Sequence, residues 1–372
     1  MAIRSPLRRL THLAGLAGLA LTPLLPTLAH AGSLPPDPTT AAQLAGGPGS
    51  TDAARCTVPY GDAPAAVSTA MSGMGSAALT GLGATLLDRC GLIGAETLSW
   101  TDPTGDRRSA CLIVPPQASR SKPLPLLTFL QGSLFPATPQ VPLTGWQPQT
   151  RTADLSGDPQ RPGFILLLPI GRNTHHFYPF PDEYAPGWDN WYRNLDRRSP
   201  WLNLDVAAID QFIEMVKARG IVDANRQYMT GWSNGAAMAQ LYALNTPSVA
   251  AAAVYSSPDP FKDVQDPCHQ QPFATTLTPL MDVHNSCDII GICQTGSAFH
   301  QDLAQRFPGL QQKHVILNAL KQQVPACNAM CASQNPALNP IGNVNHLVWP
   351  TNWNQAMFKW LRDHPLSSKP QP

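Results

Sequence analysis

Residues 231–235 have the sequence GWSNG and fit the pattern G-x-S-x-G. This pattern is typical of a serine held on a sharp turn between a strand and a helix, with its hydroxyl oxygen exposed for attack. The flanking sequence agrees, because a short apolar run, Gln227–Thr230, precedes the motif and an alanine-rich run, Gly235–Ala243, follows it. We therefore predict that Ser233 is a nucleophile. The alternative is an ordinary serine in a tight strand–helix turn.

A serine nucleophile needs a base that takes its proton and an acid that orients the base. With the serine on such a turn, the chain order is serine, then aspartate or glutamate after a later strand, then histidine. Asp288 follows the predicted strand Leu280–His284, and His346 comes just before a predicted terminal helix. We therefore predict Asp288 as the acid and His346 as the base.

Other side chains compete for these roles. Asp282 lies inside the predicted strand, so it should point into packing or across the sheet. His284 precedes the predicted acid and breaks the chain order. His300 and His314 precede or open the last predicted strand and fit helix and surface positions better. The alternative for His346 is a loop histidine that caps the terminal helix.

The negative charge that develops during acyl transfer needs backbone donors. The first should be the amide of Asn234, the residue after the nucleophile. The second should come from the loop after the predicted strand Leu126–Leu130, where Gly132 lets the backbone turn its amides inward. We predict the amide of Ser133, with a simple β-turn as the alternative.

Aromatic residues are dense between His175 and Trp201. In enzymes with a serine nucleophile on a strand–helix turn, loops at this position cover the active site. Aromatic walls suit an apolar ester, a polyester chain or an aromatic acid. The alternative is that a long loop uses its aromatic side chains to pack itself down. His175 and His176 lack a third ligand at a metal-binding spacing, so we predict no metal and no cofactor. The predicted substrate contacts are Trp188, Trp191, Trp232 and Trp349.

The elements that must position these side chains follow from hydrophobic periodicity. A strand–turn–strand pattern covers residues 96–114, and Pro125 fits only as the entry to the next strand. Strands that alternate with helices predict an α/β fold with a mostly parallel sheet covered on both faces. Beyond the runs already named, strands are predicted at 163–168, 249–255 and 313–316, and helices at 77–88, 206–218 and 353–362.

Composition limits the class of protein. The chain has 372 residues, a net charge of +1, 13% charged residues and 43% hydrophobic residues. This mixed composition excludes collagen, a coiled coil and a disordered chain. The near-neutral charge offers no basic field for nucleic acid or an anionic membrane, so we expect neither as a partner.

The N-terminus has the features of an export signal. Arg4, Arg8 and Arg9 precede an apolar run over residues 10–29, and residues 29–31 read Ala-His-Ala, a small-x-small cleavage site. Pro23 and Pro26 make the apolar run too short for a membrane anchor. We therefore predict a signal peptide over 1–31, a leader and N-terminal segment over 32–94 and a catalytic domain over 95–372. The mature protein is expected to be secreted, either periplasmic or extracellular.

In an oxidising compartment the eight cysteines are expected to form disulfides. Three precede residue 112 and five follow residue 267, so complete pairing requires at least one bridge between the two ends of the chain. The pairing itself stays open, because eight cysteines allow about 105 connectivities.

Taken together, these motifs resemble the secreted esterase family that includes polyhydroxybutyrate depolymerases and feruloyl esterases. The likeness runs from about Glu96 to His364 and is strongest over residues 221–236. Residues 284–288 (HNSCD) are similar to the family's His-Gly-x-x-Asp, and residues 346–350 (HLVWP) to its His-x-Trp-Pro. The resemblance implies an α/β-hydrolase fold and a serine carboxylesterase with Ser233, Asp288 and His346 in the three catalytic roles.

The chain departs from this family in three places: Gln131 stands where the family has His, Asn285 replaces a turn glycine, and the His346–Trp349 interval has one extra residue. We predict hydrolysis of polyhydroxyalkanoate polymers or oligomers, with feruloyl or short-chain esters as the alternative. No Thr-rich linker or β domain follows the terminal helix, which favours soluble oligomers, small esters or amorphous polymer. A prolyl-oligopeptidase-type peptidase and a non-catalytic binding protein on this scaffold are the remaining alternatives.

Overall fold

The computed structural model describes residues 89–368 apart from 104, 134–135, 177–182, 189–196, 199, 201–202, 261–275, 334 and 336–337. The predicted signal peptide, the predicted helix at 77–88 and nearly all of the predicted leader lie outside these residues. Trp191 lies outside them as well.

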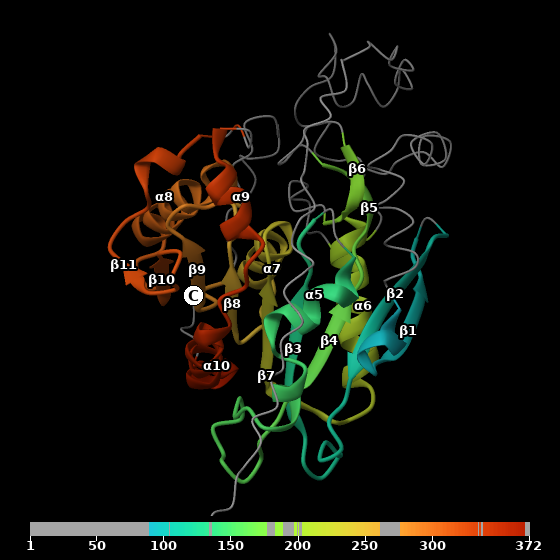
Figure 1. Cartoon of the computed structure of the whole chain (residues 1–372). Helices are drawn as coiled ribbons and strands as arrows, with labels where there is room; N and C mark the ends of the chain where they lie inside the picture. Colours follow the sequence, from blue (N-terminus) through green and yellow to red (C-terminus); the bar gives the residue numbers. More distant parts are fainter. Residues whose placement is uncertain are drawn as a thin grey trace, which may run out of the picture. The chain divides into compact units, whose positions relative to one another are not determined.

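A nine-stranded sheet forms the centre of the described residues, in the order β1-β2-β4-β3-β7-β8-β9-β10-β11 (Figure 1). The neighbouring strands from β4 through β10 run parallel, whereas β2 is antiparallel to both β1 and β4, and β11 is antiparallel to β10. The strands are β1 (Glu96–Thr101), β2 (Arg107–Ile113), β3 (Leu124–Leu130), β4 (Ile165–Pro169), β7 (Val222–Gly231), β8 (Ala251–Tyr255), β9 (Leu280–Asn285), β10 (Gln312–Leu317) and β11 (Gln323–Val324).

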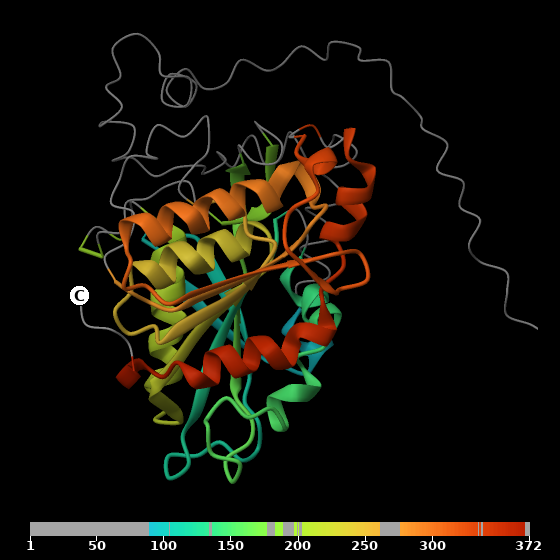
Figure 2. The same cartoon turned by 90° about the vertical axis from the view of Figure 1, so that its left-hand side faces the viewer.

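Helices cover both faces of the sheet. Alternate residues of a strand point to opposite faces, so β3 sends Leu126 and Leu130 into one core and Leu127 and Phe129 into the other. The first core contains α6 (Leu204–Lys217), α7 (Asn234–Leu244) and α8 (Ile292–Arg306), and the second contains α5 (Ala137–Thr144) and α10 (Asn354–Asp363). Figure 2 shows α7 and α8 side by side on one face and α10 on the opposite face.

This architecture is the α/β-hydrolase fold, as the sequence predicts. The predicted strands and the helices at 206–218, 235–243 and 353–362 are present, although β7 begins five residues earlier than expected, at Val222. Pro125 lies one residue inside β3, and the pairing of β3 with β7 is irregular between Leu124 and Leu126. The strand thus accommodates a residue that has no N–H to donate.

Three helices and one hairpin go beyond the sequence prediction. In α8 the buried positions include Cys293, Gly296 and His300, which hide the apolar periodicity. Helix α5 contains Pro142, and α9 (Pro340–His346) is short and polar. Strands β5 (Arg172–His176) and β6 (Glu183–Gly187) pair as a separate antiparallel hairpin that overlaps the start of the aromatic stretch between His175 and Trp201.

Six of the eight cysteines are paired in the part of the chain that the structure describes: Cys90–Cys111, Cys287–Cys331 and Cys293–Cys327. Such bonds form and persist in oxidising compartments. Each bridge stays within one end of the chain. The predicted bridge between the two ends concerns Cys56 and Cys268, which lie outside the described residues. Among the described helices, none combines the length and the apolar character needed to cross a bilayer.

Candidate active site

Ser233 lies on the turn between β7 and α7, at the N-cap of the helix. Its backbone has φ +57° and ψ −124°, a conformation that a non-glycine residue adopts at a cost and that is common at active sites. The two glycines of the motif are required by contact. A Cβ on Gly231 would collide with the Gly235 carbonyl, and a Cβ on Gly235 would collide with the backbone of Leu130 and Gln131.

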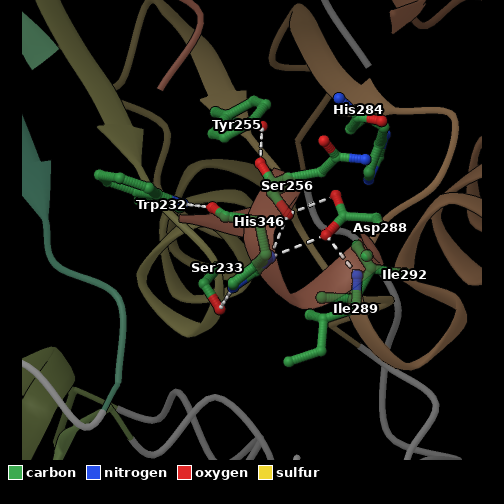
Figure 3. A network of polar contacts seen from close by, with 12 residues as sticks. Trp232, Ser233, Tyr255, Ser256, His284, Asp288, Ile289, Ile292 and His346 are labelled. Atoms are coloured by element: carbon green, nitrogen blue, oxygen red, sulfur yellow. Dashed lines mark hydrogen bonds and ion pairs between the residues drawn. The ribbon is translucent and has the colours of Figure 1, made fainter. Parts of the chain in front are cut away.

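The structure brings the three predicted catalytic side chains together (Figure 3). His346 Nε2 lies 2.9 Å from Ser233 Oγ, and His346 Nδ1 lies 2.8 Å from Asp288 Oδ1. Asp288 has no solvent exposure and His346 is 8% exposed. This geometry orients the imidazole so that Nε2 can accept the serine proton while Nδ1–H donates to the carboxylate.

Asp288 is fixed by the loop that follows β9. Its Oδ1 accepts the backbone N–H of Ile289 at 2.8 Å, which caps a short 3-10 helix, Ile289–Gly291. Its carbonyl accepts Asn339 Nδ2 at 2.7 Å. The preceding residue, Cys287, is bonded to Cys331. The predicted acid is therefore held by its own side-chain cap, by an asparagine from a distant loop and by the disulfide of the preceding residue.

His346 is the last residue of α9, whose N-cap Asn339 accepts the Gly342 N–H at 2.8 Å. The end of this helix is anchored by two aromatic donors. Trp232 Nε1 donates to the His346 carbonyl at 3.0 Å, and the Tyr255 hydroxyl donates to the Asn345 carbonyl at 3.1 Å. The backbone that carries the base is thus tied to the nucleophile turn and to β8.

Burial, and then the nearby Asp288 carboxylate, raise the pKa of Tyr255 well above its usual range. Tyr255 therefore stays neutral and remains a donor at physiological pH. Lys321 Nζ lies 5.9 Å from the Tyr255 ring centroid and donates to the Val348 carbonyl at 3.1 Å. Burial lowers the pKa of Lys321, and the attraction of Asp288 offsets part of that effect.

The predicted oxyanion loop lies against the nucleophile. Asn234 opens α7, so the helix N-terminus is directed at the site. A Cβ on Gly132 would lie 3.4 Å from Ser233 Cβ, so the loop carrying Ser133 passes close to the nucleophile. The amide of Gly132 itself donates to Gln140 Oε1 at 2.9 Å, which fixes the loop. Gln131 uses its side chain elsewhere, since its Oε1 accepts the Gly171 N–H at 3.0 Å.

The three described tryptophans are buried and pack in the core around the site, and their contact with substrate stays a prediction. Trp188, Trp232 and Trp349 are 0%, 5% and 4% exposed. Trp188 Nε1 donates to the Gln131 carbonyl, and Trp349 Nε1 to Asn354 Oδ1. Trp232 packs against Tyr255 and Trp349. Their size and N–H groups are used internally, as is usual for buried indoles.

Sequence reasoning did not find Tyr255 and Asn339, which hold the backbone beside the predicted base and at the predicted acid. Their contacts come from the sheet order and from a loop far along the chain, so only an N-cap pattern before Pro340 offered a signal. Within the described residues, no group of three histidine, cysteine or acidic side chains is arranged to hold a metal ion.

In comparisons of sequence, no family model and no curated protein matches the chain. A thermostable esterase structure is 18% identical, covering 73% of this chain and 63% of its own, with a TM-score of 0.44. An S-formylglutathione hydrolase from Agrobacterium tumefaciens is 12% identical, covering 73% and 95%, with a TM-score of 0.46. An acylaminoacyl peptidase is 10% identical, covering 75% and 42%, with a TM-score of 0.41. The chain spans less than two thirds of the esterase and of the peptidase.

Proposed function

We propose that this protein is a serine hydrolase that cleaves carboxylic esters through an acyl-enzyme. The observation that carries the proposal is the continuous line of hydrogen bonds from Ser233 Oγ through His346 to Asp288, built on a strained strand–helix turn. Nucleophilic acyl transfer requires a serine on a sharp strand–helix turn, an oriented histidine and a buried acid.

In the first step Ser233 Oγ attacks the ester carbonyl carbon while its proton moves to His346 Nε2. The tetrahedral oxyanion is stabilised by the amides of Asn234 and Ser133. The intermediate then collapses, the bond to the alcohol oxygen breaks, and His346 returns the proton to that oxygen. Asp288 stabilises the imidazolium that forms between the two proton transfers.

In the second step water replaces the alcohol. His346 Nε2 takes a proton from water while the water oxygen attacks the acyl carbon. When the second tetrahedral intermediate collapses, His346 returns that proton to Ser233 Oγ. The products are a carboxylic acid and the free enzyme.

For the substrate we propose polyhydroxyalkanoate polymers or oligomers, with polyhydroxybutyrate as the test case. Support comes from the resemblance of residues 221–236, 284–288 and 346–350 to the secreted esterase family that includes polyhydroxybutyrate depolymerases and feruloyl esterases. Feruloyl and short-chain esters are the alternative. The N-terminal pattern over residues 1–31 and the three disulfides support export.

The experiment measures release of 3-hydroxybutyrate from an amorphous polyhydroxybutyrate suspension by the mature protein. The test variant is Ser233→Ala and the matched control is Ser121→Ala, which changes an exposed serine. Release by the wild type and the control, but not by Ser233→Ala, would support both substrate and nucleophile.

A serine-directed phosphonate separates the two parts of the proposal. If folded wild type reacts at Ser233 but releases no 3-hydroxybutyrate, the polyester substrate is wrong, and feruloyl and short-chain esters are tested next. If the phosphonate does not react at Ser233 and no ester is cleaved, the hydrolase proposal itself is wrong.

A further inference from the structure

A second buried serine contacts two members of the catalytic line. Ser256 Oγ donates to Asp288 Oδ2 at 2.7 Å and lies 2.8 Å from His346 Nδ1 (Figure 3). Ser256 has no solvent exposure. It follows the last residue of β8, the strand next to β7, which leads to the nucleophile.

The donors and acceptors can be assigned from chemistry. Asp288 is a carboxylate that can only accept, so the Ser256 hydroxyl proton points to it. Ser256 Oγ must then accept from His346 Nδ1–H, which it shares with Asp288 Oδ1 at 2.8 Å. With its proton on Nδ1, His346 keeps a lone pair on Nε2 for the proton of Ser233 Oγ.

The serine also completes the environment of the buried acid. Asp288 accepts the Ile289 N–H, the His346 Nδ1–H and the Ser256 hydroxyl. A carboxylate with no exposure needs such partners to stay charged. Removing the Ser256 hydroxyl would take a donor from Asp288 Oδ2 and change the orientation of the carboxylate toward the His346 imidazole.

The backbone of Ser256 has a conformation that is unfavourable for a non-glycine residue, which indicates that its side chain has a role. Its φ is +58°, a region that glycine adopts readily and other residues rarely. Its N–H donates to the Val283 carbonyl at 2.8 Å, which continues the ladder between β8 and β9 and holds this conformation. Non-glycine residues in such conformations cluster at functional sites.

We propose that Ser256 is a positioning residue for ester hydrolysis, which fixes the Nδ1–H tautomer of His346 and orients the Asp288 carboxylate. It acts through the acid and the base and does not touch substrate. The proposal rests on the serine-hydrolase function of the same site.

The test uses Ser256→Gly, which removes the hydroxyl and suits the positive φ, so that the fold is retained. Ser256→Ala serves as a second variant. The matched control is Ser257→Ala, because Ser257 is equally buried but its hydroxyl donates to the Pro258 carbonyl and not to the catalytic line. The measurements are kcat and KM on a 4-nitrophenyl butyrate substrate.

We expect kcat to fall about 10- to 100-fold in both Ser256 variants with KM unchanged, as for loss of a hydrogen bond to a charged group. The control should stay near wild type. A kcat within about twofold of wild type in Ser256→Gly, or an equal loss in Ser257→Ala, would overturn the proposal.

Proton NMR gives a readout that simple packing would not move. In the wild type the Nδ1–H of His346 is shared between two acceptors, whereas in Ser256→Gly it bonds to Asp288 alone. We expect its low-field resonance to move further downfield, and an unmoved resonance would contradict the proposal. If the wild type reacts with the phosphonate while both readouts stay unchanged, only this inference fails. If the wild type neither reacts with the phosphonate nor cleaves an ester, the proposed function fails.

Discussion

Strand β9 supports two groups of histidine and aspartate side chains that differ in what their ring nitrogens reach. Beyond its end, Asp288 orients His346, whose Nε2 faces Ser233 Oγ. Within it, Asp282 and His284 contact His300 and His314. The residue types are the same, yet only the first group meets a serine on a strand–helix turn.

The side chains of the second group form hydrogen bonds with residues that pack the sheet against its helices. Asp282 Oδ2 accepts Gln240 Nε2 at 2.7 Å and lies 3.3 Å from His300 Nε2. His284 Nε2 donates to the Ser257 carbonyl at 2.8 Å, and its Nδ1 lies 3.0 Å from His314 Nε2. Gln240 belongs to α7 and His300 to α8, so this group joins the sheet to its helix layer.

Position relative to the strand therefore decides which groups these side chains can reach. A side chain inside a strand points into one of the two packed layers, as Asp282 does toward α7 and α8. A side chain on the loop after the strand reaches the carboxyl edge of the sheet, where open α/β sheets bind their ligands. We call the first group, the proposed acid and base Asp288 and His346, the catalytic pair. The second is the buried histidine group, Asp282, His284, His300 and His314.

The largest expected effect separates the two groups by activity. His346→Ala should lower kcat on the order of a million-fold, because it removes the base. His300→Gln should leave kcat within about threefold, since its contacts belong to packing. Ester hydrolysis by the two purified variants is the measurement, and comparable losses would contradict the assignment of roles.

The two aspartates should fail in different assays. Asp288→Asn should lower kcat by about 10⁴-fold with the fold retained, because the amide favours the wrong tautomer of His346. Asp282→Asn should instead lower the free energy of unfolding by about 1–3 kcal/mol, through the weakened bonds to Gln240 and His300.

Kinetics and urea denaturation of both variants check this contrast. A stable Asp282→Asn protein with a kcat reduced as strongly as that of Asp288→Asn would reverse the assignment of the acid.

Sequence reasoning could place the catalytic pair because its signals are local or depend only on chain order. The nucleophile motif lies between an apolar strand and an alanine-rich helix, and Asp288 and His346 follow in sequence. Such patterns can be recognised without knowing the order of the strands in the sheet.

Other features depend on which strands become neighbours. Ser256 reaches Asp288 because β8 pairs with β9, and Tyr255 reaches Asn345 from the same strand. A serine or tyrosine at a strand end is too common to stand out. Helix α8 was missed because it buries Cys293, Gly296 and His300 in place of aliphatic side chains.

The disulfides provide a smaller contrast between a bridge at the site and one away from it. Replacing Cys287 and Cys331 with alanine should lower stability by about 2–4 kcal/mol and also reduce kcat, since the loop carries Asp288. Replacing Cys90 and Cys111 should lower stability by a similar amount with kcat near wild type. Thermal unfolding and ester hydrolysis test both double variants, and equal kcat values would show that the first bridge does not position the acid.

The smallest effect concerns pH and the buried histidine group. Burial, together with the neighbouring His284 and His300, lowers the pKa of His314 to about 3. An unfolded histidine has a pKa of about 6.5, so between these values the unfolded chain binds more protons and stability falls as pH falls. For Asp282, burial raises the pKa, but the surrounding histidines outweigh it and the net pKa is lowered. Its stabilising effect is lost as pH falls from the unfolded aspartate pKa of about 3.9 through the lowered folded pKa.

His314→Gln keeps a donor for His284 and removes the titration. Between pH 6 and 4, the free energy of unfolding of this variant should fall less steeply with decreasing pH than that of the wild type, by up to about 1 kcal/mol per pH unit. The control is His364→Gln, a histidine bonded to Trp360 and Gln311 away from this group. Urea denaturation across this range decides the matter. Because the catalytic pair is untouched, the pH profile of kcat should not change in His314→Gln, and a changed profile would mean that the two groups on β9 are coupled rather than separate.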